Sequence, residues 1–382
     1  MQKTKTEALI ITHKLFTGPP DDLVTYLREY KKCNITYITH DFGSRKSRIS
    51  SLFYYKEKED VFFVSSIDYK FLPEILVYIK DVFYSLVYAL MYREKWDIFV
   101  SGDALLFIPG YLLKKFGFVK KLYFYSIDFS PNRFSNSLLN KIFFAIDRFA
   151  VRNADQVWNV SPMIEKGRGK YYGYGKNMFP NQIVVPVGAW NDRIRKYSLD
   201  QLKTKTGVFM GHILEKQGIQ MVLQSMPYIL KTIPEFKLKI IGEGPHLSEL
   251  LKIVNELQLT EFVEFLGFID DHKKVEEIIA ECICGFATYD PAKVDFTYYA
   301  DPGKVKVYLS CGIPVIMTDA SYFTNELISN NAGRLVDYNA LDIASNLIDL
   351  LLSENELSLI RHSAVKLGQK YNWENIFNKL DL

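Results

Sequence analysis

The sequence contains few cysteines for its length. Its 382 residues include four, at positions 33, 282, 284 and 311, which is too few for a disulfide framework in a chain of this size. Cys282 and Cys284 lie in one apolar run that is typical of a β-strand. Because no second ligand pair and no histidine cluster accompanies them, we expect buried thiols rather than a metal site.

Long apolar runs are missing as well. The apolar run at 8–12 is too short for the core of a signal peptide. The longest apolar stretch, 71–92, is interrupted by Glu74, Lys80 and Asp81, and charges of this kind are costly inside a bilayer. We therefore expect a cytoplasmic protein without a membrane span.

The net charge is small, but it is unevenly distributed. Residues 1–200 carry 30 lysines and arginines against 20 acidic residues, a charge of +10, whereas residues 201–382 carry 17 against 24, a charge of −7. A basic first half and the aromatic segments 71–92 and 138–149 favour peripheral contact with the inner face of a membrane. The alternative is that both segments only pack on the first sheet. No nucleic-acid-binding module is present, so we expect no nucleic-acid partner.

Strand-like and helical runs alternate along the whole chain. This alternation predicts an α/β fold with two doubly wound, mainly parallel sheets. The polar stretch 191–206 is the expected linker between an N-terminal domain over 1–195 and a C-terminal domain over 205–370. The predicted strands cover 8–12, 35–39, 60–65, 97–101, 121–126, 156–160, 182–186, 206–210, 237–241, 262–266, 283–288 and 313–317. The predicted helices include 21–32, 72–93, 137–152, 245–257, 271–281 and 304–310.

Glycines follow the ends of several predicted strands. Gly18 follows the first strand, and in the second half Gly211, Gly242, Gly244 and Gly267 follow successive strands. Ligands bind at the carboxyl ends of strands in open α/β sheets, and glycine lets the backbone approach a ligand closely. For Gly18 alone, a phosphate contact and a plain turn both remain open.

The order and spacing of these clusters resemble the donor-binding domain of GT-B glycosyltransferases of the GT4-like group. Members of that family read G-R-x4-K-G, G-x-G-P, F-x-G and A-x-G-x-P-V-I, and the counterparts here span 211–218, 242–245, 265–267 and 310–316. The resemblance implies two Rossmann-like domains that face a central cleft. It implies a nucleotide sugar on the C-terminal domain, an acceptor on the N-terminal domain, and a final helix within 371–382 that crosses back to the first domain.

The sequence departs from this family in its basic residues. The family arginine after the first glycine is His212 here, and the family lysine is Gln217, with Lys216 one position earlier. The resemblance implies that His212 and Lys216 stabilise the charge of the leaving diphosphate. A histidine is the weaker group for this task, because it is mostly neutral at pH 7 unless its pKa is shifted.

Both glutamates of the family's E-x7-E motif are also absent. Counting back from Gly312 places them at Tyr299 and Val307, and Asp301 is the candidate substitute for the first acid. Lys304 matches a lysine of relatives that read P-x-K-x-x-E, at a predicted helix start where it would meet a diphosphate. The predicted donor-binding residues are Gly18, Gly211, His212, Lys216, Gly242, Gly244, Phe268, Tyr298, Tyr299, Asp301, Gly303 and Lys304.

Asp128 is the predicted catalytic residue. It follows the strand 121–126 at the expected ligand-binding edge of the first sheet. Its carboxylate would accept the proton of the attacking hydroxyl in an inverting enzyme, and it would orient the sugar in a retaining one. The alternatives are that Asp128 caps the next turn or pairs with Arg133. His13 and His40 follow other strands and are lower-ranked candidates.

The resemblance and these residues predict a glycosyltransferase. It would transfer a sugar from a UDP- or GDP-sugar to a saccharide or a lipid-linked saccharide in glycan biosynthesis. The family as a class needs no bound metal, and we expect none here. Two alternatives stay open: a non-catalytic relative that binds a nucleotide or a partner transferase, and a GT-B nucleotide-sugar epimerase. The absent glutamates leave retention and inversion undecided.

Overall fold

The computed structural model describes residues 5–14, 17–41, 47–56, 59–92, 95–173, 179–202, 204–293 and 298–382. The chain divides into two compact units. Unit 1 comprises Met1–Pro186 and Phe377–Leu382, and unit 2 comprises Val187–Ile376. The division falls at Pro186, ahead of the linker expected from the sequence. Part of that expected linker packs on unit 2, where the Arg193 guanidinium donates two hydrogen bonds to Glu276, at 2.6 and 2.7 Å.

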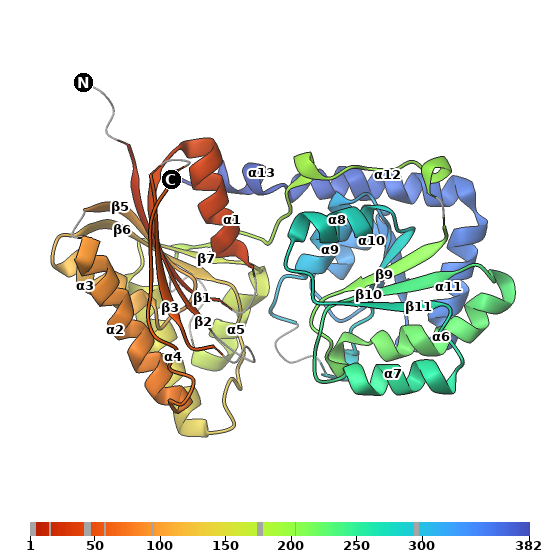
Figure 1. Ribbon diagram of the computed structural model, residues 1–382, viewed down its shortest axis with the longest axis horizontal. Coiled ribbons are helices and arrows are strands. Elements are labelled where there is room, and N and C mark those ends of the chain that lie inside the picture. Colours follow the sequence, from red (N-terminus) through yellow and green to blue (C-terminus); the bar gives the residue numbers. More distant parts are fainter. Residues whose placement is uncertain are drawn as a thin grey trace. The chain divides into compact units, whose positions relative to one another are not determined.

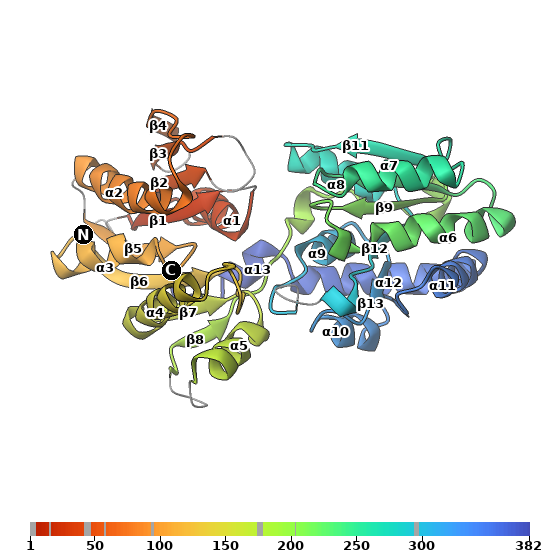
Figure 2. The same cartoon turned by 90° about the horizontal axis from the view of Figure 1, so that it is seen from below.

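Unit 1 is built on one sheet with the strand order β4-β3-β2-β1-β5-β6-β7-β8. The strands are β1 (Glu7–Lys14), β2 (Asn34–Asp41), β3 (Ser50–Lys56), β4 (Glu59–Ser65), β5 (Trp96–Ser101), β6 (Val119–Ser126), β7 (Gln156–Asn159) and β8 (Gln182–Val184). β3 pairs antiparallel with both β2 and β4, and the neighbours from β2 through β1 to β8 pair parallel. Figure 2 shows β4 at one end of this sheet and β8 at the other. The order reverses between β1 and β5, which is where open α/β sheets bind ligands.

The helices of unit 1 follow its strands. They are α1 (Pro19–Tyr26), α2 (Glu74–Tyr92), α3 (Phe107–Lys115), α4 (Ser137–Asn153) and α5 (Pro162–Tyr172). The sequence patterns did not predict α3, α5 or β3. Pro109 and Gly110 argue against a helix, but a side chain at Gly110 would overlap the Phe99 ring, so glycine lets α3 pack closely on β5. The end of the predicted helix at Arg93 lies outside the described residues. No helix in the described part of the chain is both long and apolar enough to cross a membrane.

Unit 2 contains an all-parallel sheet with the order β11-β10-β9-β12-β13-β14. Its strands are β9 (Thr206–Met210), β10 (Lys237–Ile241), β11 (Val263–Gly267), β12 (Cys284–Ala287), β13 (Val315–Thr318) and β14 (Gly333–Val336). Its helices are α6 (Ile219–Thr232), α7 (Leu247–Glu256), α8 (His272–Ala280), α9 (Gly303–Ser310), α10 (Thr324–Ser329), α11 (Ala340–Leu352), α12 (Glu354–Lys370) and α13 (Trp373–Phe377). The order reverses between β9 and β12, so this sheet also has a topological switch point.

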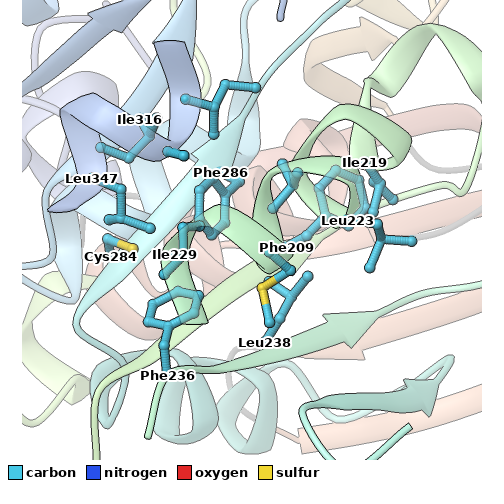
Figure 3. Packing of buried hydrophobic residues seen from close by; sticks show 14 of the residues in the cluster. Phe209, Ile219, Leu223, Ile229, Phe236, Leu238, Cys284, Phe286, Ile316 and Leu347 are labelled. Carbon is cyan, nitrogen blue, oxygen red and sulfur yellow. The ribbon is translucent and has the colours of Figure 1, made fainter. Parts of the chain in front are cut away.

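Two apolar cores cover the faces of the unit 2 sheet. One gathers residues of α6, α7 and α11, and the other gathers residues of α8, α9 and α10, with α12 contributing to both. Figure 1 shows α6 and α7 on one side of the strands and α8 and α9 on the other. In the first core, Figure 3 shows Phe209, Leu238 and Phe286 of three neighbouring strands beside Ile219 and Leu223 of α6. All four cysteines are buried and unbridged, as expected for packed thiols.

The last residues of the chain belong to unit 1. The Phe377 ring lies 5.2 Å from the Tyr26 ring, and the Tyr26 hydroxyl donates a hydrogen bond of 2.7 Å to Asn378. The Lys121 ammonium lies 2.7 Å from the Asp381 carboxylate. These contacts fix the terminal segment on α1 and β6.

Candidate functional site

Unit 1 contains a cavity of about 700 Å³ where the loops after β1, β5 and β6 meet. Gly18, Asp103 and Asp128 line it from these three loops, and side chains of α2 and α4 form its walls. The cavity therefore lies at the switch point between β1 and β5, where a ligand is expected.

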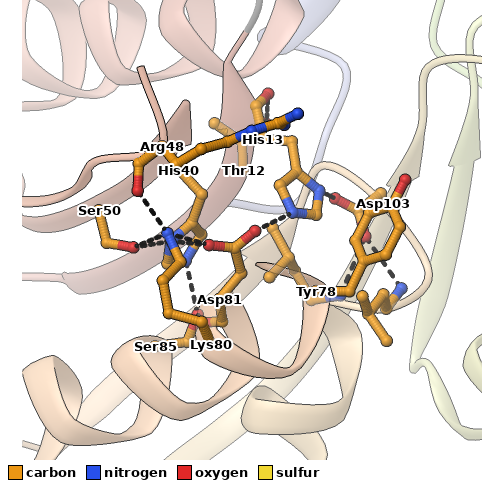
Figure 4. A network of polar contacts seen from close by, with 12 residues as sticks. Thr12, His13, His40, Arg48, Ser50, Tyr78, Lys80, Asp81, Ser85 and Asp103 are labelled. Atoms are coloured by element: carbon orange, nitrogen blue, oxygen red, sulfur yellow. Dashed lines mark hydrogen bonds and ion pairs between the residues drawn. The ribbon is translucent and has the colours of Figure 1, made fainter. Parts of the chain in front are cut away.

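His13 is held between two carboxylates beside this cavity (Figure 4). Its Nδ1 lies 2.6 Å from Asp103 Oδ2, and its Nε2 lies 3.1 Å from Asp81 Oδ2. Burial by itself lowers the pKa of His13, but Asp103 and Asp81 outweigh it and raise that pKa to about 9. Both ring nitrogens are thus engaged by carboxylates in an imidazolium, which makes His13 a poor proton acceptor at neutral pH.

Asp81 also connects His13 to a second, neutral histidine. Lys80 Nζ lies 2.7 Å from Asp81 Oδ1, and the Asp81 side chain is fully buried. The His40 ring nitrogens lie 2.8 Å from the hydroxyls of Ser50 and Ser85. Burial lowers the pKa of His40 to about 3, so this ring stays neutral. His40 therefore has a structural role. This role differs from the one expected from the sequence, where His40 was a lower-ranked candidate for the site.

The opposite pKa shifts of His13 and His40 predict that the free energy of unfolding is highest near pH 6.5. The raised pKa of His13 contributes stability that is complete below 6.5 and is lost as pH rises through about 9, a loss of roughly 3 kcal/mol. The lowered pKa of His40 contributes stability that is present above 6.5 and is lost as pH falls toward about 3. Urea unfolding across this range checks it: His13→Gln should flatten the alkaline limb and His40→Gln the acidic limb. Identical pH profiles for both variants and the wild type would contradict it.

Asp128 lines the cavity next to Arg133. The Arg133 guanidinium donates hydrogen bonds of 3.2 and 3.3 Å to the two Asp128 oxygens and lies 4.8 Å from the centre of the Phe143 ring. The Asp128 side chain remains 49% exposed, so it can still accept a hydrogen bond from a ligand. Its role in catalysis stays a prediction.

In unit 2, Lys304 lies at the switch point between β9 and β12. It is the second residue of α9, and its Nζ donates a hydrogen bond of 2.5 Å to Gln217. The ammonium lies 4.0 Å from the centre of the Phe209 ring and 5.1 Å from that of Tyr289. Burial holds the pKa of Lys304 well below its usual range. Because no described carboxylate forms an ion pair with it, the site has an unbalanced cation that an anion would stabilise.

The glycines of unit 2 bring its loops together. A side chain at Gly242 would overlap the carbonyl of Gly211, and one at Gly244 would overlap that of Ile213. Gly211 has a positive φ of 142°, and a Cβ there would lie 3.2 Å from Lys304 Nζ. Gly242 and Gly244 therefore allow the neighbouring loop to pack closely, and their contact with a donor stays a prediction.

The other predicted donor contacts surround this cluster less closely. Burial, followed by the charge of Lys216, lowers the pKa of His212, so this ring is mostly neutral as expected. Phe268 is 38% exposed and Tyr298 is 42% exposed. The Tyr299 ring is buried in an edge-to-face contact of 5.3 Å with Tyr298. Gly303 begins α9, directly before Lys304. Their contacts with a donor stay predictions.

Asp301 needs a correction, because its carboxylate is enclosed. It accepts hydrogen bonds from the Val187 amide at 2.7 Å and the Tyr322 hydroxyl at 2.9 Å, and Lys306 Nζ lies 3.2 Å away. The side chains of Asp301 and Lys306 are both fully buried. Burial raises the pKa of Asp301, and burial also lowers the pKa of Lys306 to about 8. Asp301 therefore anchors the loop before α9 and is not exposed to a donor.

This buried pair yields a prediction on stability. Asp301→Ala should lower the free energy of unfolding by about 3–5 kcal/mol, because it leaves the Lys306 ammonium buried without its counter-ion. The double variant Asp301→Asn with Lys306→Met should lie within about 1.5 kcal/mol of the wild type, because it removes both charges. Urea unfolding measures both. A double variant that is destabilised as strongly as Asp301→Ala would contradict the pairing.

The sequence interpretation missed the residues that hold His13. Asp103 directly follows Gly102 at the end of β5, a position that could have identified it. Lys80 and Asp81 gave a second signal, since two adjacent charges in an otherwise apolar helix must find buried partners. Their distance along the chain, 68 residues between His13 and Asp81, concealed the contact.

Comparison with known proteins identifies the class first. Both units have the parallel Rossmann-like sheets of GT-B glycosyltransferases. The structure of sucrose-phosphate synthase from Thermosynechococcus elongatus aligns with a TM-score of 0.72, at 16% identity over 98% of this chain and 97% of that one. HepE from Anabaena in complex with UDP-glucose aligns with a TM-score of 0.66, at 15% identity over 97% of both chains. The predicted fold class of two Rossmann-like domains is therefore confirmed.

Unit 2 matches a known family. Residues 204–353 match the family described as Glycosyl transferases group 1. The chain is 22% identical over 170 residues to the GDP-mannose-dependent alpha-(1-6)-phosphatidylinositol monomannoside mannosyltransferase of Mycolicibacterium smegmatis, covering 44% of each chain. It is 24% identical over 188 residues to the alpha-monoglucosyldiacylglycerol synthase of Streptococcus pneumoniae, covering 46% of this chain and 41% of that one. The chain spans about half the length, or less, of these curated relatives.

Proposed function

We propose that this protein is a glycosyltransferase that transfers a sugar from a UDP- or GDP-sugar to a hydroxyl group of a saccharide or lipid-linked saccharide. The observation that carries the proposal is Lys304, a partly buried cation at the start of α9 without a described counter-ion. A diphosphate placed there would meet the ammonium and the positive end of the helix dipole. Two relatives support the donor class: one is named as GDP-mannose-dependent, and HepE was solved with UDP-glucose.

The residues of the proposed site have different roles. Lys304 and Lys216 would stabilise the negative charge that develops on the leaving nucleoside diphosphate. The cavity of unit 1 would hold the acceptor, with one of its hydroxyls hydrogen-bonded to Asp128. Group 1 is a retaining family, so we assign Asp128 to orienting a sugar hydroxyl and not to removing its proton.

The transfer reaction itself tests this proposal. The protein is incubated with UDP-glucose or GDP-mannose, labelled in the sugar, and with soluble and lipid-linked saccharides, and the products are separated. We expect label in a product that forms only when an acceptor is present. Asp128→Asn should slow transfer at least about tenfold and leave nucleotide binding unchanged, because Asp128 belongs to unit 1. An epimerised sugar without acceptor would instead indicate a nucleotide-sugar epimerase.

One observation favours a second candidate, a non-catalytic nucleotide-binding relative. The positions of the two family glutamates hold Tyr299 and Val307, and the nearest acid, Asp301, is enclosed. Nucleotide binding without turnover across the whole acceptor panel would support this candidate and contradict transfer.

A further inference from the structure

The cavity of unit 1 is polar at one end and apolar along its walls. Its polar end is formed by the loops after β1, β5 and β6, where His13 and Asp103 meet (Figure 4). Its apolar walls come from two helices, Ile75, Ile79 and Val82 of α2 and Leu139, Ile142 and Ile146 of α4. A pocket of this shape fits an amphiphile better than a sugar alone, because a sugar would leave the apolar walls in contact with water.

The apolar walls open onto the surface of unit 1. Ile75, Ile79 and Ile142 line the cavity, yet their side chains are 56%, 61% and 47% exposed. Phe83, one helical turn beyond Ile79, is 60% exposed. Large apolar side chains gathered on one exposed face mark a binding surface. A chain that enters the cavity can therefore leave it along α2.

The charges at the polar end select the headgroup. Four carboxylates line the cavity, those of Asp21, Glu74, Asp103 and Asp128. His13, Arg133 and Lys14 pair with Asp103, Asp128 and Asp21, respectively, and Glu74 accepts a hydrogen bond from the Tyr78 hydroxyl. These cations are already paired and Glu74 adds a negative charge, so no described residue at this end favours an anionic headgroup, whereas the hydroxyls of a neutral saccharide can donate hydrogen bonds to the carboxylates.

We propose that this cavity binds a glycolipid acceptor, with a neutral saccharide headgroup at the polar end and an aliphatic chain between α2 and α4. The inference rests on the proposed function and names the class of its acceptor. Lys70, just before α2, and Lys141, next to Ile142 in α4, are both exposed, and lysines beside apolar side chains favour contact with an anionic membrane surface, where such lipids are found.

Calorimetric titration with decyl maltoside below its micelle concentration tests this inference, with maltose and decyl sulfate as comparisons. Each buried methylene strengthens binding about fourfold, so decyl maltoside should bind at least about tenfold more tightly than maltose. Decyl sulfate, with the same chain and an anionic head, should bind more weakly than decyl maltoside. Equal binding of maltose and decyl maltoside, or tighter binding of decyl sulfate, would overturn the inference.

Three variants test where the aliphatic chain of the ligand binds. Ile79→Asn and Ile142→Asn should each weaken decyl maltoside binding at least about tenfold. Met91→Asn is the matched control, since Met91 lies on α2 outside the cavity lining and is 59% exposed. All three sites are exposed, so thermal unfolding without ligand should be unchanged, and equal weakening by Met91→Asn would overturn the inference. No donor is present in this titration, so the result does not depend on sugar transfer. Sugar transfer by a protein whose binding does not depend on the aliphatic chain would contradict this inference but not the proposed function.

Discussion

Lys304→Met is expected to abolish nucleotide binding without destabilising the ligand-free protein. Methionine keeps an apolar stem beside Phe209 and Tyr289 but carries no charge to balance a diphosphate. Losing such a group should reduce transfer by about 10²–10³-fold. Burial lowers the pKa of Lys304, so its charge costs stability in the ligand-free protein, and the wild type gains stability as pH rises toward 10.5. The variant should lack this gain.

Calorimetric nucleotide titration and urea unfolding measure these two effects separately. Lys252→Met is the matched control, since Lys252 also belongs to unit 2 but is 62% exposed. We expect this control to bind nucleotide like the wild type. If Lys304→Met still binds nucleotide with unchanged affinity, the assignment of Lys304 to the diphosphate is wrong.

The second large effect is expected from Asp81→Ala. The substitution removes the carboxylate that lies 3.1 Å from His13 Nε2 and 2.7 Å from Lys80 Nζ, both in a buried setting. Lys80 then loses its carboxylate partner and His13 keeps only Asp103, so the free energy of unfolding should fall by about 3–5 kcal/mol. The pKa of His13 should fall as well, because one of the two carboxylates that raise it is gone.

An exposed aspartate provides the control for this prediction. Asp60 pairs with Arg28 at 2.7 Å, but its side chain is 75% exposed, so Asp60→Ala should cost less than about 1 kcal/mol. Urea unfolding measures both variants, and NMR titration follows the His13 ring. An Asp81→Ala variant as stable as Asp60→Ala would show that the network around His13 contributes little.

Much of the fold could be predicted because its signals are local. The apolar runs 8–11 in β1 and 208–210 in β9 are buried or nearly so, as expected for parallel strands covered on both faces. α3 could not be predicted, because Pro109 and Gly110 speak against a helix and the reason for Gly110 is the Phe99 ring on a neighbouring strand. In α3, tertiary packing therefore outweighs the low helix propensity of the local sequence.

The residues of the candidate site could also be predicted only in part. Lys304 could be placed at the start of a helix from its motif alone. Asp301 could not be assigned, because its burial depends on Tyr322 and Val187, which are distant in the sequence. The pairing of His13 with Asp103 spans 90 residues, and nothing in either local sequence specifies the partner.

The central claim is that unit 2 binds the nucleoside diphosphate of a sugar donor through Lys304. Thermal unfolding in the presence of UDP, GDP, ADP or CMP, with the wild type and Lys304→Met, tests it most directly. We expect one nucleotide, at about 100 times its Kd, to stabilise the wild type by about 2.7 kcal/mol and to leave the variant unshifted. Unfolding of the wild type that is unchanged by all four nucleotides, or an equal shift in both proteins, would contradict the claim.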